Sequence, residues 1–290
     1  MNKKLNKAKI TKNDEFYTRF EDVNTELINY SNQFFNKIVY CPCDNPNLSN
    51  FTKYFRDNFE KLGIKRLVST CYPQGIMEVV DNEGIKTLQL EGDGDFRSEE
   101  CVRIMKSCDV VVTNPPFSLF KDFIKLIEKF GKKFLIIGSK TAVRYKEVIT
   151  KIISGQMWNG FRPWSGGMWF ICDKKEKDED VRMINGFYCK NVSSIWFTNL
   201  ERPEREITFN TCVTFEEGNS QGWYETYDGI NAINVNKTNQ IPMDYDGVMG
   251  VPITFIEKFN PKQFTLLEIV NVPKINGKSI YTRLLIRKRK

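Results

Sequence analysis

The stretch that decides the fold class is residues 109–117, which reads Asp-Val-Val-Val-Thr-Asn-Pro-Pro-Phe. Three consecutive valines predict a strand that is buried on both faces, as in a parallel sheet. Pro115 and Pro116 cannot donate to a ladder, and Asn114 is restricted to extended conformations because a proline follows it. The chain therefore leaves the carboxyl end of a buried strand in a stiff loop, where the ligands of open α/β sheets bind.

The Asn-Pro-Pro-Phe loop suits the activation of an amino group whose lone pair is delocalised into a ring or a carbonyl. The side-chain oxygen of Asn114 and the carbonyl of Pro115 would accept its hydrogens and return the lone pair to nitrogen, while Phe117 would stack on a planar substrate. This is electrostatic preorganisation without a titrating base, which agrees with a chain that contains no histidine. The candidate catalytic residues are Asn114, Pro115, Pro116 and Phe117. A rigid turn after a core strand is the alternative interpretation.

Strand and helix patterns alternate around this loop. They predict an α/β fold with a mainly parallel central sheet and helices on both faces. A helix is expected from Asp22 to Phe35, with Asp22 as its cap, and a hairpin with a four-residue loop is expected around Asp81–Gly84. Further strands are expected at residues 37–40, 66–70 and 133–138, and further helices at residues 51–62, 98–106, 118–130 and 142–153.

Composition points to a folded protein with a polyanionic partner. The 290 residues are 41% hydrophobic and 13% aromatic, which argues against disorder. No apolar run has the length of a membrane span, and the N-terminus lacks the apolar core of a signal peptide, so a soluble cytoplasmic protein is expected. The net charge is +7, with basic stretches at Lys3–Lys12 and Arg287–Lys290. These suit nucleic acid, although basic chain ends are often only solvated.

The eight cysteines do not indicate a metal site. Cys41 and Cys43 form the one close pair, but Cys-x-Cys is not the usual zinc spacing, and Cys101 and Cys108 supply no second knuckle. Most of the thiols are expected to be reduced core residues. Residues 93–95, Asp-Gly-Asp, lack the twelve-residue ligand pattern of a calcium loop. Without histidine, Ser-His and Cys-His hydrolase mechanisms are excluded.

Several segments resemble known proteins. Asn114–Phe117 resembles the catalytic motif of S-adenosylmethionine-dependent amino-methyltransferases. Asn13–Arg19, Val39–Asp44, Gly92–Arg97 and Gly250–Phe255 resemble the EcoRI-type adenine-specific DNA methyltransferases, and this similarity runs over nearly the whole chain.

The resemblance implies a Rossmann-like class I methyltransferase fold with two domains. Residues 1–206 would form the S-adenosylmethionine-binding catalytic domain, and residues 207–290 a smaller, strand-rich module for target recognition. Strands at Gly166–Phe170 and Asn191–Leu200 would close the central sheet as an antiparallel hairpin. An aromatic, basic C-terminal module could grip DNA, or it could only pack on the sheet.

The implied reaction moves a methyl group from S-adenosylmethionine to the exocyclic N6 amine of an adenine that is flipped out of duplex DNA and stacked on Phe117. The role would be restriction-modification or protection of phage DNA. Double-stranded DNA is the implied partner, and no membrane contact is expected. The resemblance is also compatible with a cognate restriction endonuclease as a further partner. RNA or protein-glutamine methylation by the same loop, and a catalytically inactive nucleic-acid-binding protein, are the alternatives. The oligomeric state is left open.

The resemblance also places the cofactor. Tyr17 and Thr18 match the motif that holds its methionine end, although an aromatic clasp on the core is an equal interpretation. Residues 41–50 replace the family's glycine-rich acidic loop and contain no Gly-x-Gly. Asp44 would accept from the cofactor's ammonium group, or it would only shape a turn. The expected cofactor-binding residues are Tyr17, Thr18, Cys43, Asp44, Pro46, Ser49, Thr70 (near the ribose), Asp95 (on the adenine amino group) and Phe96 (on the adenine ring).

Overall fold

The chain contains two compact units. The computed structural model describes residues 17–172 and 181–289. Unit 1 comprises Met1–Glu147 and Asn159–Glu201, and unit 2 comprises Val148–Trp158 and Arg202–Lys290. The basic arm expected at residues 1–12, the motif residues 13–16 and the charged segment 173–180 lie outside the described residues. A functional boundary at residue 206 stays a prediction.

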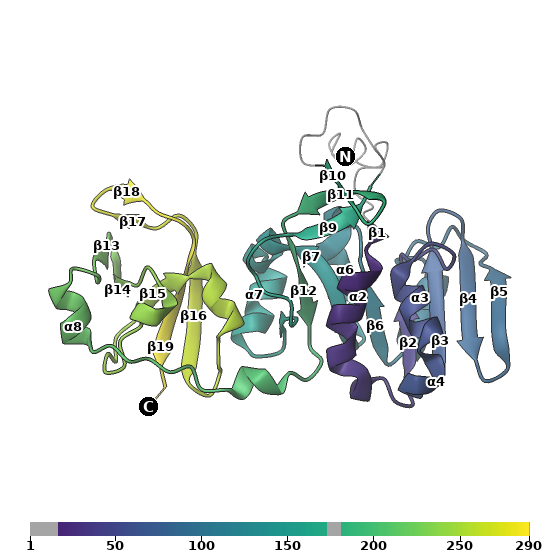
Figure 1. The fold of residues 1–290 in the computed structure, drawn as a ribbon, viewed down its shortest axis with the longest axis horizontal. Coiled ribbons are helices and arrows are strands. Elements are labelled where there is room, and N and C mark those ends of the chain that lie inside the picture. Colours follow the sequence, from purple (N-terminus) through teal and green to yellow (C-terminus); the bar gives the residue numbers. More distant parts are fainter. Residues whose placement is uncertain (1–16, 173–180, 290) are drawn as a thin grey trace. The chain divides into compact units, whose positions relative to one another are not determined.

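A mixed eight-stranded sheet forms the centre of unit 1 (Figure 1), in the order β5-β4-β3-β2-β6-β7-β12-β8. The four central strands β3, β2, β6 and β7 are parallel, whereas β4, β5 and β12 run antiparallel to their neighbours. The expectation of a mainly parallel sheet therefore holds only for the centre. The strands are β2 (Ile38–Cys41), β3 (Arg66–Cys71), β4 (Ile76–Asp81), β5 (Gly84–Gln89), β6 (Val110–Thr113), β7 (Lys133–Ser139), β8 (Trp158–Asn159) and β12 (Ser194–Thr198).

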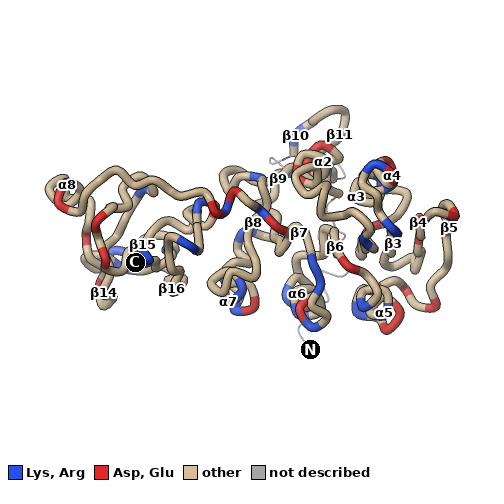
Figure 2. Tube along the Cα trace, turned by 90° about the horizontal axis from the view of Figure 1, so that it is seen from below, with Lys and Arg blue, Asp and Glu red and all other residues tan. Residues whose placement is uncertain are grey.

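Helices cover both faces of this sheet (Figure 2). One face carries α2 (Phe20–Leu27), α3 (Asn50–Asp57) and α4 (Phe59–Leu62), and the other carries α5 (Glu99–Ser107) and α6 (Phe120–Lys129). Every residue of β6 is buried, as its three valines predict.

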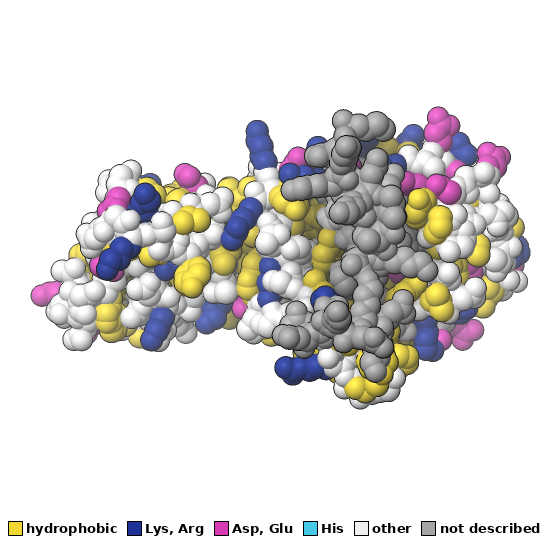
Figure 3. Space-filling model, turned by 90° about the horizontal axis from the view of Figure 1, so that it is seen from above, with side chains coloured by type: hydrophobic (Ala, Val, Ile, Leu, Met, Phe, Trp, Pro, Cys, Tyr) yellow, Lys and Arg dark blue, Asp and Glu magenta, His cyan; other side chains and the backbone are white. Residues whose placement is uncertain are grey.

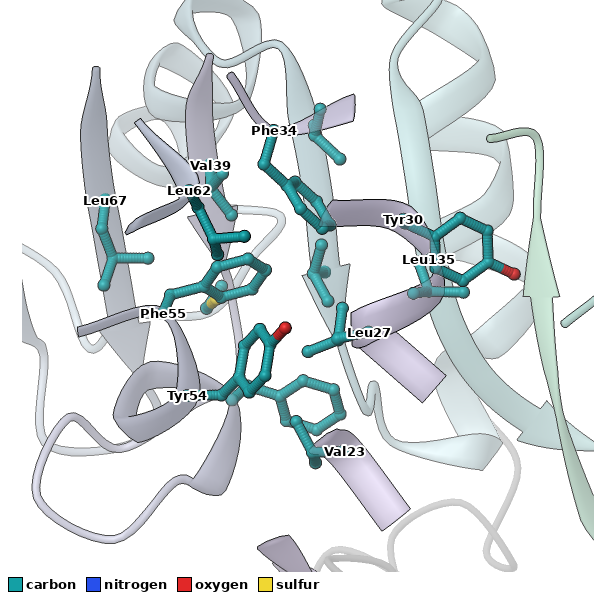
Figure 4. Close-up of a cluster of buried hydrophobic side chains, with 14 of the residues drawn as sticks. Val23, Leu27, Tyr30, Phe34, Val39, Tyr54, Phe55, Leu62, Leu67 and Leu135 are labelled. Atoms are coloured by element: carbon teal, nitrogen blue, oxygen red, sulfur yellow. The ribbon is translucent and has the colours of Figure 1, made fainter. Parts of the chain in front are cut away.

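The hydrophobic core of unit 1 lies between the sheet and the first of these helical layers (Figure 4). Side chains of α2 and α3 pack there against strand residues that alternate along β2, β6 and β7, because successive strand residues point to opposite faces. This core includes Val23, Leu27, Tyr30, Phe34, Val39, Tyr54, Phe55, Leu62, Leu67 and Leu135.

The first helix and the hairpin differ from expectation. Helix α2 begins at Phe20 with Arg19 as its cap, and it continues as the 3-10 helix η1 (Ile28–Gln33). Asp22 is therefore not a cap; its carboxylate instead accepts from Arg19 Nε at 2.9 Å and from the Arg162 guanidinium. The hairpin is confirmed, but its strands extend to Asp81 and Gly84 and leave a loop of only two residues.

A separate four-stranded sheet corrects a further expectation. Its order is β1-β9-β11-β10, so β9 does not join the central sheet, and β12 alone of the two expected strands pairs with β7. Burial explains the difference: β12 is buried along its whole length, whereas β9 alternates between buried and half-buried residues, as suits a sheet with one solvated face. The strands are β1 (Tyr17–Thr18), β9 (Met168–Ile171), β10 (Val181–Ile184) and β11 (Phe187–Val192).

Unit 2 contains a five-stranded sheet in the order β13-β14-β15-β19-β16 and a two-stranded ribbon of β17 and β18. The strands are β13 (Thr226–Tyr227), β14 (Ile230–Asn234), β15 (Met249–Pro252), β16 (Phe264–Val270), β17 (Lys274–Ile275), β18 (Lys278–Ser279) and β19 (Arg283–Lys288). The other helices in residues 17–172 and 181–289 are α7 (Lys146–Ile153), α8 (Phe215–Ser220), and the 3-10 turns η2 (Phe117–Leu119), η3 (Lys140–Arg144), η4 (Pro203–Glu206), η5 (Thr238–Gln240) and η6 (Ile253–Glu257).

A buried carboxylate joins α2 to a distant segment of unit 1. Glu26 accepts from the backbone N–H of Phe161 at 2.6 Å and of Arg162 at 2.9 Å, and Tyr30 Oη donates to it at 3.1 Å. Glu26 is only 2% exposed. Because a buried amide that loses its acceptor bears the full desolvation cost, this contact should be among the more stabilising ones in unit 1.

We expect Glu26→Ala to lower the free energy of unfolding by about 3 kcal/mol, because two amide groups lose their acceptor. Tyr30→Phe removes one hydrogen bond from the same carboxylate and should lower it by only about 1 kcal/mol. Urea unfolding of the two variants beside the wild type measures both values. Equal losses in the two variants would contradict the role given to Glu26.

Candidate active site

The candidate site lies at the carboxyl ends of β2 and β6. Helix α3 leads from β2 to β3 on one side of β2, whereas β6 pairs with β2 on the other side. The loops after β2 and β6 therefore diverge from a point where the strand order reverses, and such switch points are the usual ligand sites of open α/β sheets. Asp44 follows β2 closely, and Asn114 is the first residue after β6.

Asp44 connects the ends of three strands. Its carboxylate accepts from Ser49 Oγ at 2.6 Å and makes a 2.5 Å hydrogen bond with Thr113 Oγ1 at the end of β6. Its backbone N–H donates to the carbonyl of Thr70, in β3, at 2.9 Å. Thr113 was not identified from the sequence; its place immediately before the Asn-Pro-Pro-Phe loop was the available signal.

The hydrogen-bond pattern around Thr113 fits a protonated Asp44. Thr113 Oγ1 is close to both the Asp44 carboxyl and the carbonyl of Pro42. A hydroxyl carries one hydrogen, so Thr113 can donate to only one of these two oxygens. If Asp44 donates to Thr113 and Thr113 donates to Pro42, both contacts are hydrogen bonds.

Burial raises the pKa of Asp44 to about 7, and its hydrogen bonds with Ser49 and Thr113 offset only part of this shift. The protonated and ionised forms of the Asp44 carboxyl are therefore about equally populated near neutral pH. A cationic group placed beside it would favour the carboxylate, because an opposite charge nearby favours the charged form. The site can thus accept an ammonium group.

The start of α3 brings β1 to the same place. Ser49 caps α3 by accepting from the backbone N–H of Phe51 at 3.1 Å, and the neighbouring Asn50 Nδ2 donates to the carbonyl of Thr18 at 2.7 Å. Thr18 is 4% exposed, and among the described residues its hydroxyl has no hydrogen-bond partner. Tyr17 is 43% exposed.

The loop after β2 keeps its shape without a Gly-x-Gly. Cys43 has a φ of 65°, a left-handed conformation that glycine adopts at lower cost. The carbonyl of Pro46 accepts from Arg56 Nη2 at 2.7 Å, and Arg56 also reaches the buried Glu78 of β4 at 3.5 Å. Side-chain contacts therefore support this loop, which contains no glycine.

The acidic loop of residues 91–98 packs against the end of β3. Gly94 has a φ of 82°, and a Cβ there would lie 2.2 Å from the carbonyl of Cys71, so this close approach requires glycine. Asp95 is bound by Arg97, with Nε at 2.9 Å and Nη2 at 2.5 Å. Phe96 is 3% exposed and packs edge-on against Phe123 of α6, with ring centroids 4.9 Å apart.

The Asn-Pro-Pro-Phe loop leads from β6 into α6. Asn114, Pro116 and Phe117 are half-buried, Pro115 is buried, and the N–H of Leu119 donates to the carbonyl of Pro116 at 2.9 Å. Phe117 packs at the margin of the unit 1 core.

The structure therefore brings Thr18, Asp44, Ser49 and Asn114 together near the carboxyl ends of the central strands β2 and β6. The side chain of Thr70 is 0% exposed and is hydrogen-bonded to Tyr40 Oη at 2.8 Å. Phe96 lies in the packing against α6. Ligand contacts by all of the expected site residues, Thr70, Asp95 and Phe96 included, stay predictions.

Within residues 17–172 and 181–289, no three His, Cys, Asp or Glu side chains are grouped so as to hold a metal ion. No helix in these ranges combines the length and apolar character that a membrane crossing requires. All eight cysteines are free thiols.

The sequence matches known methyltransferases over its whole length. The family model described as adenine-specific methyltransferase EcoRI matches residues 4–81 and 74–289. The Type II methyltransferase M.EcoRI of Escherichia coli is 39% identical, covering 100% of this chain and 97% of the relative. M.MpnI of Mycoplasma pneumoniae is 38% identical (98% and 91%), and M.MgeORF184P of Mycoplasma genitalium is 34% identical (98% and 98%). No solved structure matches the chain.

The pKa of Asp44 predicts a pH-dependent stability. Its folded-state pKa of about 7 lies above the ordinary value of 3.8. The folded state therefore holds the proton more tightly, and the free energy of unfolding should fall as pH rises from about 4 to about 7, by roughly 4 kcal/mol in total.

The variant Asp44→Asn keeps the hydrogen-bonding capacity of the protonated acid and cannot ionise. We expect the stability of the wild type relative to this variant to fall by roughly 2 kcal/mol between pH 5 and pH 7. Urea unfolding at several pH values measures the difference. A difference that is constant with pH would show that Asp44 titrates normally.

Proposed function

The chain belongs to the family of adenine-specific methyltransferases of the EcoRI type, and we propose on this basis that it transfers a methyl group from S-adenosylmethionine to the N6 amine of adenine in double-stranded DNA. Because the relatives are named Type II methyltransferases, the proposed role is modification of DNA within a restriction-modification system. The structural observation that supports the proposal is the hydrogen bond between Asp44 and Thr113, which joins the loop after β2 to the end of β6, immediately before the Asn-Pro-Pro-Phe loop.

The residues at the end of β2 fit the proposed cofactor. Asp44 is a buried acid whose balance shifts toward the carboxylate when it meets an ammonium group, and Thr18 offers a buried hydroxyl without a hydrogen-bond partner among the described residues. Ser49 and Asn50 hold these two residues at the start of α3. When bound, S-adenosylmethionine would supply an electrophilic methyl group on its sulfonium. Asp44 and Thr18 would bind and orient its methionine end.

The Asn-Pro-Pro-Phe loop would prepare the nucleophile. The exocyclic amine of adenine is weakly nucleophilic because its lone pair is delocalised into the ring. Asn114 Oδ1 and the carbonyl of Pro115 would accept its hydrogens and localise that lone pair on nitrogen. The prolines restrict the backbone that carries both acceptors, since their φ angles are fixed.

The target base must leave the duplex to reach this loop. A base within the helix is shielded by stacking and pairing, so enzymes that act on its ring atoms or amine rotate it outward. Phe117 is the aromatic side chain next to both proposed acceptors, and it is half-buried at the margin of the core. We infer that it stacks on the extruded adenine.

Asn114→Ala should lower the rate of methyl transfer by at least about 100-fold, the usual effect of losing one preorganised hydrogen-bonding group. Affinity for S-adenosylmethionine should change little, because Asn114 contacts the substrate amine. Transfer of labelled methyl groups to duplex DNA, followed by nucleoside analysis, measures the rate and identifies the product. Asn82→Ala, in the exposed β4–β5 loop, is the matched control. Substantial activity in Asn114→Ala, or label in RNA or protein instead of DNA, would contradict the proposal.

Affinity for S-adenosylmethionine should depend on pH through Asp44. Because the ammonium group favours the carboxylate, the dissociation constant of the wild type should fall as pH rises from 5.5 to 7.5. Asp44→Asn should bind at least about tenfold more weakly at pH 7.5, and its affinity should change less with pH. Isothermal titration calorimetry measures both. Equal affinities at pH 7.5 would show that Asp44 does not bind the ammonium group.

A further inference from the structure

The C-terminal segment of the chain has an unusual charge distribution. Residues 269–290 contain seven Lys or Arg and no Asp or Glu, in a chain with 36 acidic residues. The segment includes the ribbon of β17 and β18 and the strand β19. Its charge selects a polyanion as the complementary partner.

The ribbon is a tight hairpin that extends from unit 2 (Figure 1). Lys274 pairs with Ser279 and Ile275 with Lys278, so the turn consists of Asn276 and Gly277 alone. Both turn residues have positive φ angles, 48° and 75°, as the twisted two-residue turns of hairpins require. Asparagine and glycine are the residues that adopt these angles most readily.

One side chain fixes the tip of the hairpin. The carboxylate of Asp228 accepts from the backbone N–H of Asn276 at 3.0 Å and of Gly277 at 2.8 Å, and its own N–H donates to the carbonyl of Lys274 at 2.9 Å. Ile275 is 6% exposed and packs in a small core of unit 2. The hairpin is therefore held in place before any partner binds.

The chain that leaves the hairpin is fixed as well. Arg283 is 7% exposed, and its Nε and Nη2 donate to Asn234 Oδ1 and Asn236 Oδ1, both at 3.1 Å. Tyr281 lies two residues earlier and is 88% exposed. A largely exposed aromatic side chain thus stands beside an anchored, basic hairpin.

We propose that Lys274, Lys278 and Tyr281, called here the hairpin surface, bind duplex DNA, the two lysines through phosphates and the tyrosine ring through bases. This inference rests on the proposed function and adds the DNA-binding surface to it. A two-stranded ribbon fits the major groove of DNA. Cross-strand pairing places Lys274 on the face opposite Ile275 and Lys278 on the same face as Ile275, which packs against unit 2; both lysine side chains are exposed all the same.

The exposure of the three side chains and the rigidity of the hairpin support DNA as the partner. Both lysines are exposed. The side of unit 2 on which the hairpin lies is at the left in Figure 3, where Lys and Arg side chains project among hydrophobic side chains and a few acidic ones. Tyrosine is favoured at interfaces because its ring buries a large area with few rotatable bonds. A preformed hairpin loses little conformational entropy on binding.

The test compares Lys274→Ala/Lys278→Ala with the wild type. The probe is a duplex fragment that the wild type methylates, and its dissociation constant is measured at several salt concentrations. We expect at least about tenfold weaker binding at 0.1 M salt. The slope of log affinity against log salt should fall by about 1.8, because two phosphate contacts are lost at about 0.9 each. Affinity for S-adenosylmethionine and the melting temperature should be unchanged.

The matched control is Lys61→Ala/Lys65→Ala. These exposed lysines precede β3. They therefore lie near the amino ends of the parallel strands, whereas the candidate site lies at the carboxyl ends. Tyr281→Ala should weaken DNA binding severalfold, whereas Tyr281→Phe, which keeps the ring, should bind like the wild type. If Lys274→Ala/Lys278→Ala binds DNA with the affinity and salt dependence of the wild type, and the wild type methylates DNA normally, the hairpin surface does not bind DNA. This outcome would overturn the present inference and leave the proposed function intact. A wild type that neither binds nor methylates DNA would overturn the proposed function itself.

Discussion

The buried hydrogen-bonded carboxyl of Asp44 holds the candidate site together. It contacts Ser49 and Thr113 through its side chain and Thr70 through its backbone, so three neighbouring strand ends and the start of α3 meet at one residue. A buried acid is costly unless its oxygens are hydrogen-bonded, and here both oxygens have partners. This arrangement fixes the distance between the proposed cofactor loop and the Asn-Pro-Pro-Phe loop.

The proposed cofactor loop keeps its shape without glycine. Cys43 adopts a left-handed conformation that glycine normally supplies. The carbonyl of Pro46 is held by Arg56, which also contacts Glu78 of β4. The antiparallel strand β4 thereby contributes to the shape of a loop at the carboxyl ends of parallel strands. Side-chain contacts replace backbone flexibility in this loop.

Unit 2 also uses polar side chains to fix its segments, the buried Arg283 and the exposed Asp228. Arg283 is bound by Asn234 and Asn236, and Asp228 holds the turn of the β17–β18 hairpin. In unit 1, Asp44 fixes the end of β6, and in unit 2, Asp228 fixes the turn of the β17–β18 hairpin. The proposed roles are divided accordingly, with methyl transfer assigned to unit 1 and DNA binding through a basic hairpin assigned to unit 2.

The sequence by itself determined the parallel centre of the sheet, the β4–β5 hairpin and the position of the Asn-Pro-Pro-Phe loop after a buried strand, because valine runs, turn residues and prolines act locally. It also determined the family, through motifs spread along the chain. Only the tertiary structure decided that Thr113 binds Asp44, that Arg56 supports Pro46, that β9 leaves the central sheet and that Asp22 pairs with arginines instead of capping a helix. These features depend on contacts between residues far apart in sequence or on competition for one side chain, and no local pattern encodes either.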